Sequence, residues 1–108
     1  MVRFGHETLA AYQQAVPVAR WVRQVSWPRG DADLGDQARR AAASVVLNIA
    51  EGHAHTGKAR LHHYRIARGS AAELCAVLDL VAPAGAAEQQ EALRRVGVML
   101  ERLERVRR

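Results

Sequence analysis

The chain has 108 residues, 49% of them hydrophobic and only 5% aromatic, and a formal net charge of +5 with a sequence pI of about 10.6. This length predicts one domain spanning residues 1–108, and the single cysteine excludes an intramolecular disulfide and a cysteine-based zinc site. There is neither an apolar run of about 18 residues nor a signal-peptide pattern, so we expect a cytoplasmic protein with no membrane partner.

Periodic apolar residues predict four helices, at about residues 7–25, 34–51, 58–82 and 86–107. In the first of these the apolar positions recur three and four apart, which is typical of one helical face: Leu9, Tyr12, Val16, Ala19 and Val22. Pro17 falls inside this pattern and predicts a kink. Because the connecting turns are short, we predict an all-α fold, an antiparallel up-down-up-down four-helix bundle.

The second segment is predicted to be the central helix of this bundle. Residues 41–50 carry no charge and almost only apolar or small side chains, whereas a surface helix would present charges on its outer face. Gly52 is expected to end the helix. A single polar stripe interrupts the apolar run, because Ser44, Asn48 and Glu51 are spaced four and three apart.

The third segment carries two apolar stripes, whereas a helix of an isolated bundle needs only one. The first stripe is assigned to the intramolecular core: Tyr64, Ala67, Ala71, Leu74, Leu78 and Val81. The second runs about a third of a turn away: Ile66, Ser70, Glu73, Val77 and Leu80. It predicts a homo-oligomer with Ile66, Val77 and Leu80 at the interface; the alternative is a wide core face with two stray aliphatic residues. In the fourth segment the inward positions are Leu93, Val96, Leu100 and Leu103.

Much of the chain resembles a known family. The matching stretches are residues 4–15, 37–44, 48–52 (Asn-Ile-Ala-Glu-Gly) and 66–74, which contains Ala-Arg-Gly-Ser. They are similar to the four-helix-bundle proteins related to the 23S ribosomal RNA intervening-sequence protein. This resemblance implies a ring-shaped homopentamer. Relatives include the accessory variability determinants of diversity-generating retroelements. The resemblance therefore also implies a reverse transcriptase and RNA or DNA as candidate partners.

The polar stripe of the second helix can face polar residues of the third, since the two helices are expected to be antiparallel. We predict a structural polar network of five residues: Ser44, Asn48, Glu51, Ser70 and Glu73. A small-ligand pocket and a contact between subunits are the alternatives. Because no nucleophile lies beside a base, we expect no catalytic residue and no enzymatic activity.

Four of the five histidines fall within eleven residues: His53, His55, His62 and His63. Di-iron bundles use a Glu-x-x-His pattern on paired helices, but the residue three places after Glu51 is Ala54. We therefore expect solvated or partly packed histidines, with no metal and no cofactor. A weak surface zinc or nickel site is the alternative.

Six basic residues are predicted to contact nucleic acid: Arg39, Arg40, Lys58, Arg60, Arg65 and Arg68. Residues 58–68 hold four of these cations and no acid, a pattern that favours non-specific binding to phosphates. No aromatic platform accompanies them, so sequence-specific recognition is not expected. The alternative is an oligomeric scaffold for an acidic protein partner with no role in binding nucleic acid.

Overall fold

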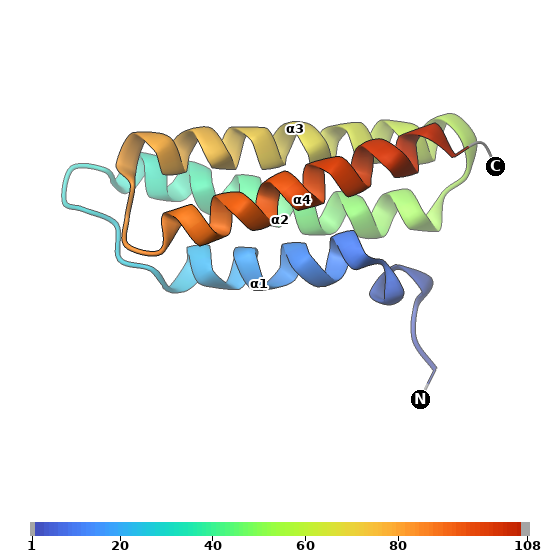
Figure 1. Cartoon of the computed structure of the whole chain (residues 1–108), viewed down its shortest axis with the longest axis horizontal. Helices are drawn as coiled ribbons and strands as arrows, with labels where there is room; N and C mark the ends of the chain where they lie inside the picture. Colours follow the sequence, from blue (N-terminus) through green and yellow to red (C-terminus); the bar gives the residue numbers. More distant parts are fainter. Residues whose placement is uncertain (1, 107–108) are drawn as a thin grey trace.

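The computed structural model describes residues 2–106, which form four α-helices preceded by one 3-10 helix and contain no strand. The elements are η1 (Gly5–Thr8), α1 (Ala10–Gln24), α2 (Ala32–Ala54), α3 (Gly57–Val81) and α4 (Ala86–Arg105). Consecutive helices run antiparallel in an elongated body of 46 × 30 × 20 Å (Figure 1). The α2–α3 contact is the most extensive, and α4 packs against both α3 and α1. The predicted all-α fold is confirmed.

The helix boundaries differ from the predicted ones mainly at two places. The first helix begins at Ala10, because residues 5–8 form η1 instead of its first turn. α2 is longer than predicted at both ends, starting at Ala32 and continuing to Ala54. α3 is displaced by only one residue, and α4 ends at Arg105, so the predicted end at residue 107 lies outside the described residues.

Gly52 was predicted to end α2, but the helix continues to Ala54 and Gly52 lies buried inside its last turns. A β-carbon at this position would lie 2.6 Å from Cε1 of the Tyr64 ring, which is only 1% exposed. Glycine is therefore required here for close packing between α2 and α3. It is not needed for a left-handed turn.

The core is built from small and branched side chains of all four helices. Its largest fully buried members are Tyr64, Ile49, Leu74, Leu78, Leu100, Val22, Val45 and Val96. The predicted inward stripes of α3 and α4 are buried as expected, except that Val81 and Leu103 are half-buried at the edge.

The predicted stripe of α1 is partly wrong. The buried positions of α1 are Ala11, Ala15, Val18 and Val22, whereas Leu9, Tyr12 and Ala19 pack at the edge of the core. Small residues face inward because α1 lies close to both α2 and α4. Pro17 is exposed, and the helix assignment continues through it.

The large apolar side chains that remain exposed on α2 and α3 are Leu47 (63%), Ile66 (37%) and Leu80 (74%). Val77, predicted to lie at an oligomer interface, is only 4% exposed and belongs to the core of the single chain. That assignment is wrong, because the Val77 side chain is already covered by its own bundle. Leu47 was not predicted, since the apolar run of α2 was expected to be covered on most sides.

Candidate functional site

Two arginines of the predicted basic stripe of α3 share one acidic partner on α4. Arg68 donates from Nε and Nη2 to the two carboxylate oxygens of Glu104, at 2.7 and 3.0 Å, and Nε of Arg65 lies 3.6 Å from the same carboxylate. The hydrogen bond to Glu104 and its charge raise the pKa of Arg68 above the ordinary arginine value. The Glu104 side chain is only 9% exposed. Residues 58–68 contain no acid themselves, but Glu104 of α4 offsets part of the charge of Arg65 and Arg68.

Arg60 caps the end of α2, which gives it a structural role instead of the predicted phosphate contact. Its Nε donates to the backbone oxygens of Gly52 (3.1 Å) and His55 (2.8 Å), and its Nη2 donates to that of His53 (3.0 Å). Carbonyl groups in the last turn of a helix have no partner within the helix. One guanidinium from α3 thus binds three backbone oxygens at this end of α2, of which that of Gly52 also accepts from the N–H of His55, and ties the two helices together.

Only two of the six predicted basic residues form no ion pair or capping contact within residues 2–106. Arg39 forms an ion pair with Asp36, one turn earlier on α2. Arg40 and Lys58 are not buried and have no acidic partner in the described part of the chain. The structure does not bring these two together, since Arg40 lies in the first half of α2 and Lys58 in the first turn of the antiparallel helix α3.

A second group of arginines, not predicted, gathers on the outer side of α4. Arg94, Arg95 and Arg102 line one open depression together with Glu91 and Val98; these three arginines are called the α4 basic surface. Arg95 donates from Nε to the side-chain oxygen of Gln14 at 2.9 Å. Arg94 lies 3.5 Å from Glu91, but both side chains are more than 60% exposed, so this pair contributes little. Arg95 and Arg102 are seven residues apart and so share one side of α4, a spacing from which no basic surface was predicted.

The polar residues between α2 and α3 form a hydrogen-bonded network that includes a histidine. The hydroxyls of Ser44 and Ser70 are 2.8 Å apart, and Nδ2 of Asn48 donates to the backbone oxygen and to Oγ of Ser44 at 3.0 and 3.1 Å. Oδ1 of Asn48 lies 2.9 Å from Nδ1 of His63. Glu73 is exposed and has no hydrogen bond or ion pair among residues 2–106, so its predicted membership is wrong. Glu51 does not bond to Arg68 or Ser70 but faces two histidines.

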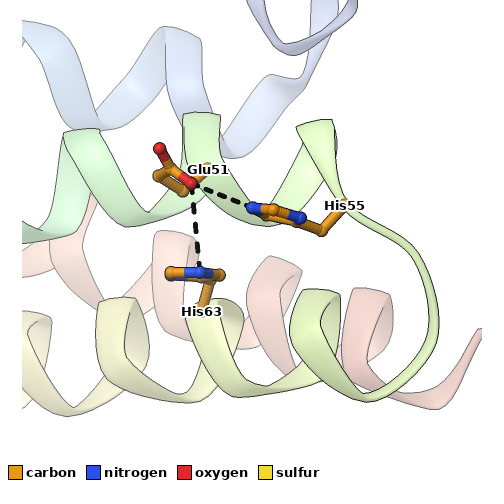
Figure 2. Close-up of side chains that lie close together, drawn as sticks. All are labelled: Glu51, His55 and His63. Carbon is orange, nitrogen blue, oxygen red and sulfur yellow. Dashed lines mark hydrogen bonds and ion pairs between the residues drawn. The ribbon is translucent and has the colours of Figure 1, made fainter.

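Glu51, His55 and His63 converge beside the α2–α3 turn (Figure 2). Nε2 of His55 is hydrogen-bonded to Oε2 of Glu51 at 3.1 Å, and Nε2 of His63 lies 3.9 Å from the same oxygen. The two imidazole rings are nearly parallel, with centroids 5.3 Å apart and an angle of 12° between their planes. We call these three residues the histidine cluster.

The other two histidines of the predicted group, His53 and His62, do not belong to the histidine cluster. His62 is exposed, and its ring meets that of His63 edge to face, with centroids 5.5 Å apart. His53 packs its ring against Gly5, where a β-carbon would lie 2.5 Å from the His53 Nε2 atom. Burial lowers the pKa of His53, and the nearby charges of Arg60 and His6 lower it further. His53 therefore anchors the N-terminal segment against α2.

Within residues 2–106, every helix lacks either the length or the apolar character required to cross a membrane. The family model described as 23S rRNA-intervening sequence protein matches residues 7–106 of the chain. The search of curated proteins found no match to the chain.

Proposed function

Since the chain belongs to the 23S rRNA-intervening sequence protein family, we propose that it is a non-enzymatic accessory protein that binds nucleic-acid phosphates without sequence selectivity. The observation that carries this proposal is the α4 basic surface, where Arg95 and Arg102 have no acidic partner among the described residues. Guanidinium groups match the geometry of phosphate oxygens. None of the side chains lining this surface is aromatic, so it offers no platform for stacking bases. A reverse transcriptase or another nucleic-acid enzyme is the partner that such a protein would dock.

Replacing Arg95 and Arg102 by glutamine should weaken binding to both single-stranded RNA and duplex DNA. For each phosphate that the variant no longer neutralises, the slope of log affinity against log salt should become shallower by roughly 0.7 for single strands and 0.9 for duplex DNA. Fluorescence anisotropy of labelled oligonucleotides at several salt concentrations measures both the affinity and this slope.

The matched control is the variant Arg65→Gln, Arg68→Gln, which removes the same net charge from residues already paired with Glu104. We expect its affinity to fall much less. An equal decrease in both variants would mean that binding follows total charge and is not localised on α4. If the wild-type protein bound neither nucleic acid even at low salt, the proposal would be wrong.

The alternative function is a scaffold for an acidic protein partner with no role in binding nucleic acid. The observation that favours it is Val98, which is 49% exposed in the middle of the α4 basic surface. An apolar side chain ringed by arginines suits a protein surface better than a phosphate backbone. Absence of nucleic-acid binding at low salt is the result that would select this alternative.

We also propose that the chain forms a homo-oligomer, with the pentameric ring implied by the family resemblance as its arrangement. Support comes from the exposed apolar side chains of α2 and α3, namely Leu47, Ile66 and Leu80. A chain of this size that builds its core largely from alanine and valine gains from covering such residues.

The variant Leu47→Asp, Leu80→Asp should form smaller particles than the wild-type protein while keeping its helical content. Both side chains are more than 60% exposed, so a charge there should disturb the bundle little. Light scattering after size-exclusion chromatography gives the mass, and circular dichroism gives the helical content. Val98→Asp, on α4, serves as the control and should leave the mass unchanged. A monomeric wild-type protein, or an unchanged mass in the double variant, would contradict the proposal.

A further inference from the structure

We propose that Glu51, His55 and His63 bind a divalent transition-metal ion of the zinc, nickel and cobalt class. One carboxylate oxygen and one ring nitrogen from each histidine all lie within 4.8 Å of one another. Glu51 is on α2 and His55 is its C-cap residue, whereas His63 comes from α3, so two helices supply the three ligands (Figure 2).

The hydrogen bonds around Asn48 determine which nitrogen of His63 faces the histidine cluster. Because Nδ2 of Asn48 donates to the backbone oxygen and hydroxyl of Ser44, its Oδ1 faces His63 and must accept. Nδ1 of His63, at 2.9 Å, is therefore the protonated nitrogen, and in the neutral ring Nε2 carries a free lone pair. Histidines that bind metals are commonly held in this way, with the second nitrogen donating to a neighbouring oxygen.

An ordinary hydrogen-bonded Glu–His pair does not account for the position of His63. His55 already donates to Oε2 of Glu51, and Nε2 of His63 is 3.9 Å from that oxygen, beyond hydrogen-bond distance. When the His63 ring is neutral, the lone pair of its Nε2 faces the Glu51 carboxylate. A divalent cation bound between the three groups would take the place of the proton that His55 Nε2 donates to Glu51. That proton is released to solvent, and the lone pairs of both imidazole rings then face a positive charge.

The distances and the ligand types both fit the proposed class of ion. Ligands bound tetrahedrally to zinc at about 2.0–2.2 Å lie about 3.3 Å from one another, and the two distances from Glu51 are 3.1 and 3.9 Å. The two ring nitrogens lie within 4.8 Å of each other, and small rotations of the exposed Glu51 and His55 side chains would bring the three ligand atoms to this spacing. Imidazole nitrogen favours zinc, nickel and cobalt over magnesium and calcium, which prefer oxygen ligands. Three protein ligands leave a fourth position open to water.

Isothermal titration calorimetry with ZnCl2 tests the proposal on full-length, untagged protein that has been stripped with a chelator. We expect one zinc ion per chain, and a Co2+-loaded sample should show the visible absorption of a tetrahedral site. Asn48→Ala should weaken binding by about 10–100-fold, the usual effect of removing a group that orients a ligand. Glu51→Gln and His55→Ala should each weaken it by more than that.

His62→Ala is the matched control, because it removes an exposed histidine adjacent to His63 without removing a ligand. It should bind zinc as tightly as the wild-type protein. Glu51 and His55 are 58% and 47% exposed, so their variants should fold normally, which circular dichroism would verify. The proposal is overturned if the wild-type protein binds no zinc, if Glu51→Gln binds it with unchanged affinity, or if His62→Ala weakens binding as much as His55→Ala.

Discussion

Gly52→Ala should destabilise the protein by about 1–3 kcal/mol, the usual cost of adding a methyl group to a closely packed core. On helix propensity alone this change would stabilise α2 by about 1 kcal/mol. The new β-carbon would, however, lie 2.6 and 2.7 Å from two ring carbons of Tyr64. That ring is almost fully buried between the helices and cannot move without disturbing the core. Urea unfolding followed by circular dichroism at a fixed protein concentration measures the change.

Gly97→Ala is the control for this prediction, because it makes the same substitution inside α4 where no atom lies within 4 Å of the added carbon. It should stabilise the protein by about 0.5–1 kcal/mol. If both variants were stabilised equally, the contact between Gly52 and Tyr64 would not be what requires a glycine in α2.

Arg60→Ala is expected to cost about 1.5–3 kcal/mol, the range measured for hydrogen bonds to charged groups. The substitution leaves the backbone oxygens of Gly52, His53 and His55 without their shared donor. Arg60→Lys should rescue little, because an ammonium group is a point charge and lacks the planar fork of guanidinium. The same urea unfolding measurement applies, and faster amide exchange at the end of α2 would locate the effect.

Lys58→Ala is the appropriate comparison for Arg60→Ala. Both remove one positive charge near the start of α3, but Lys58 is exposed and has no partner among the described residues. Its replacement should change stability by less than about 0.5 kcal/mol. Equal effects of the two substitutions would show that charge, and not capping, is what Arg60 contributes.

Local periodicity was enough to predict most of the fold. Tyr64, Ala67, Ala71, Leu74 and Leu78 are all buried, because a spacing of three and four residues describes one face of a helix regardless of its partner. The same spacing misassigned Val77, since the width of a buried face depends on how closely the neighbouring helix approaches. Alanine-rich helices approach closely, and the face of α3 that they cover is correspondingly wide.

The candidate sites were less predictable because their residues meet across helices. Glu104 lies 36 residues after Arg68, and no local charge pattern connects the two. The histidines were noticed in the sequence, but the place of Glu51 beside His55 and His63 was not predicted, because Gly52 was expected to end α2. Once the helix is known to continue to Ala54, Glu51 and His55 lie one turn apart on the same side. The two-residue turn that follows then brings His63 back beside them.

The two ends of the bundle differ in what they carry. The α2–α3 turn, the histidine cluster and the last turn of α4 lie at one end, and the α1–α2 and α3–α4 connections lie at the other (Figure 1). At that opposite end, Gly30 has a φ of +97° and open space around it, and exposed loop tips of this kind tolerate insertions. A fluorescent domain inserted at Gly30 would therefore lie at the opposite end of the bundle from the histidine cluster. It would leave the histidine cluster open to solvent.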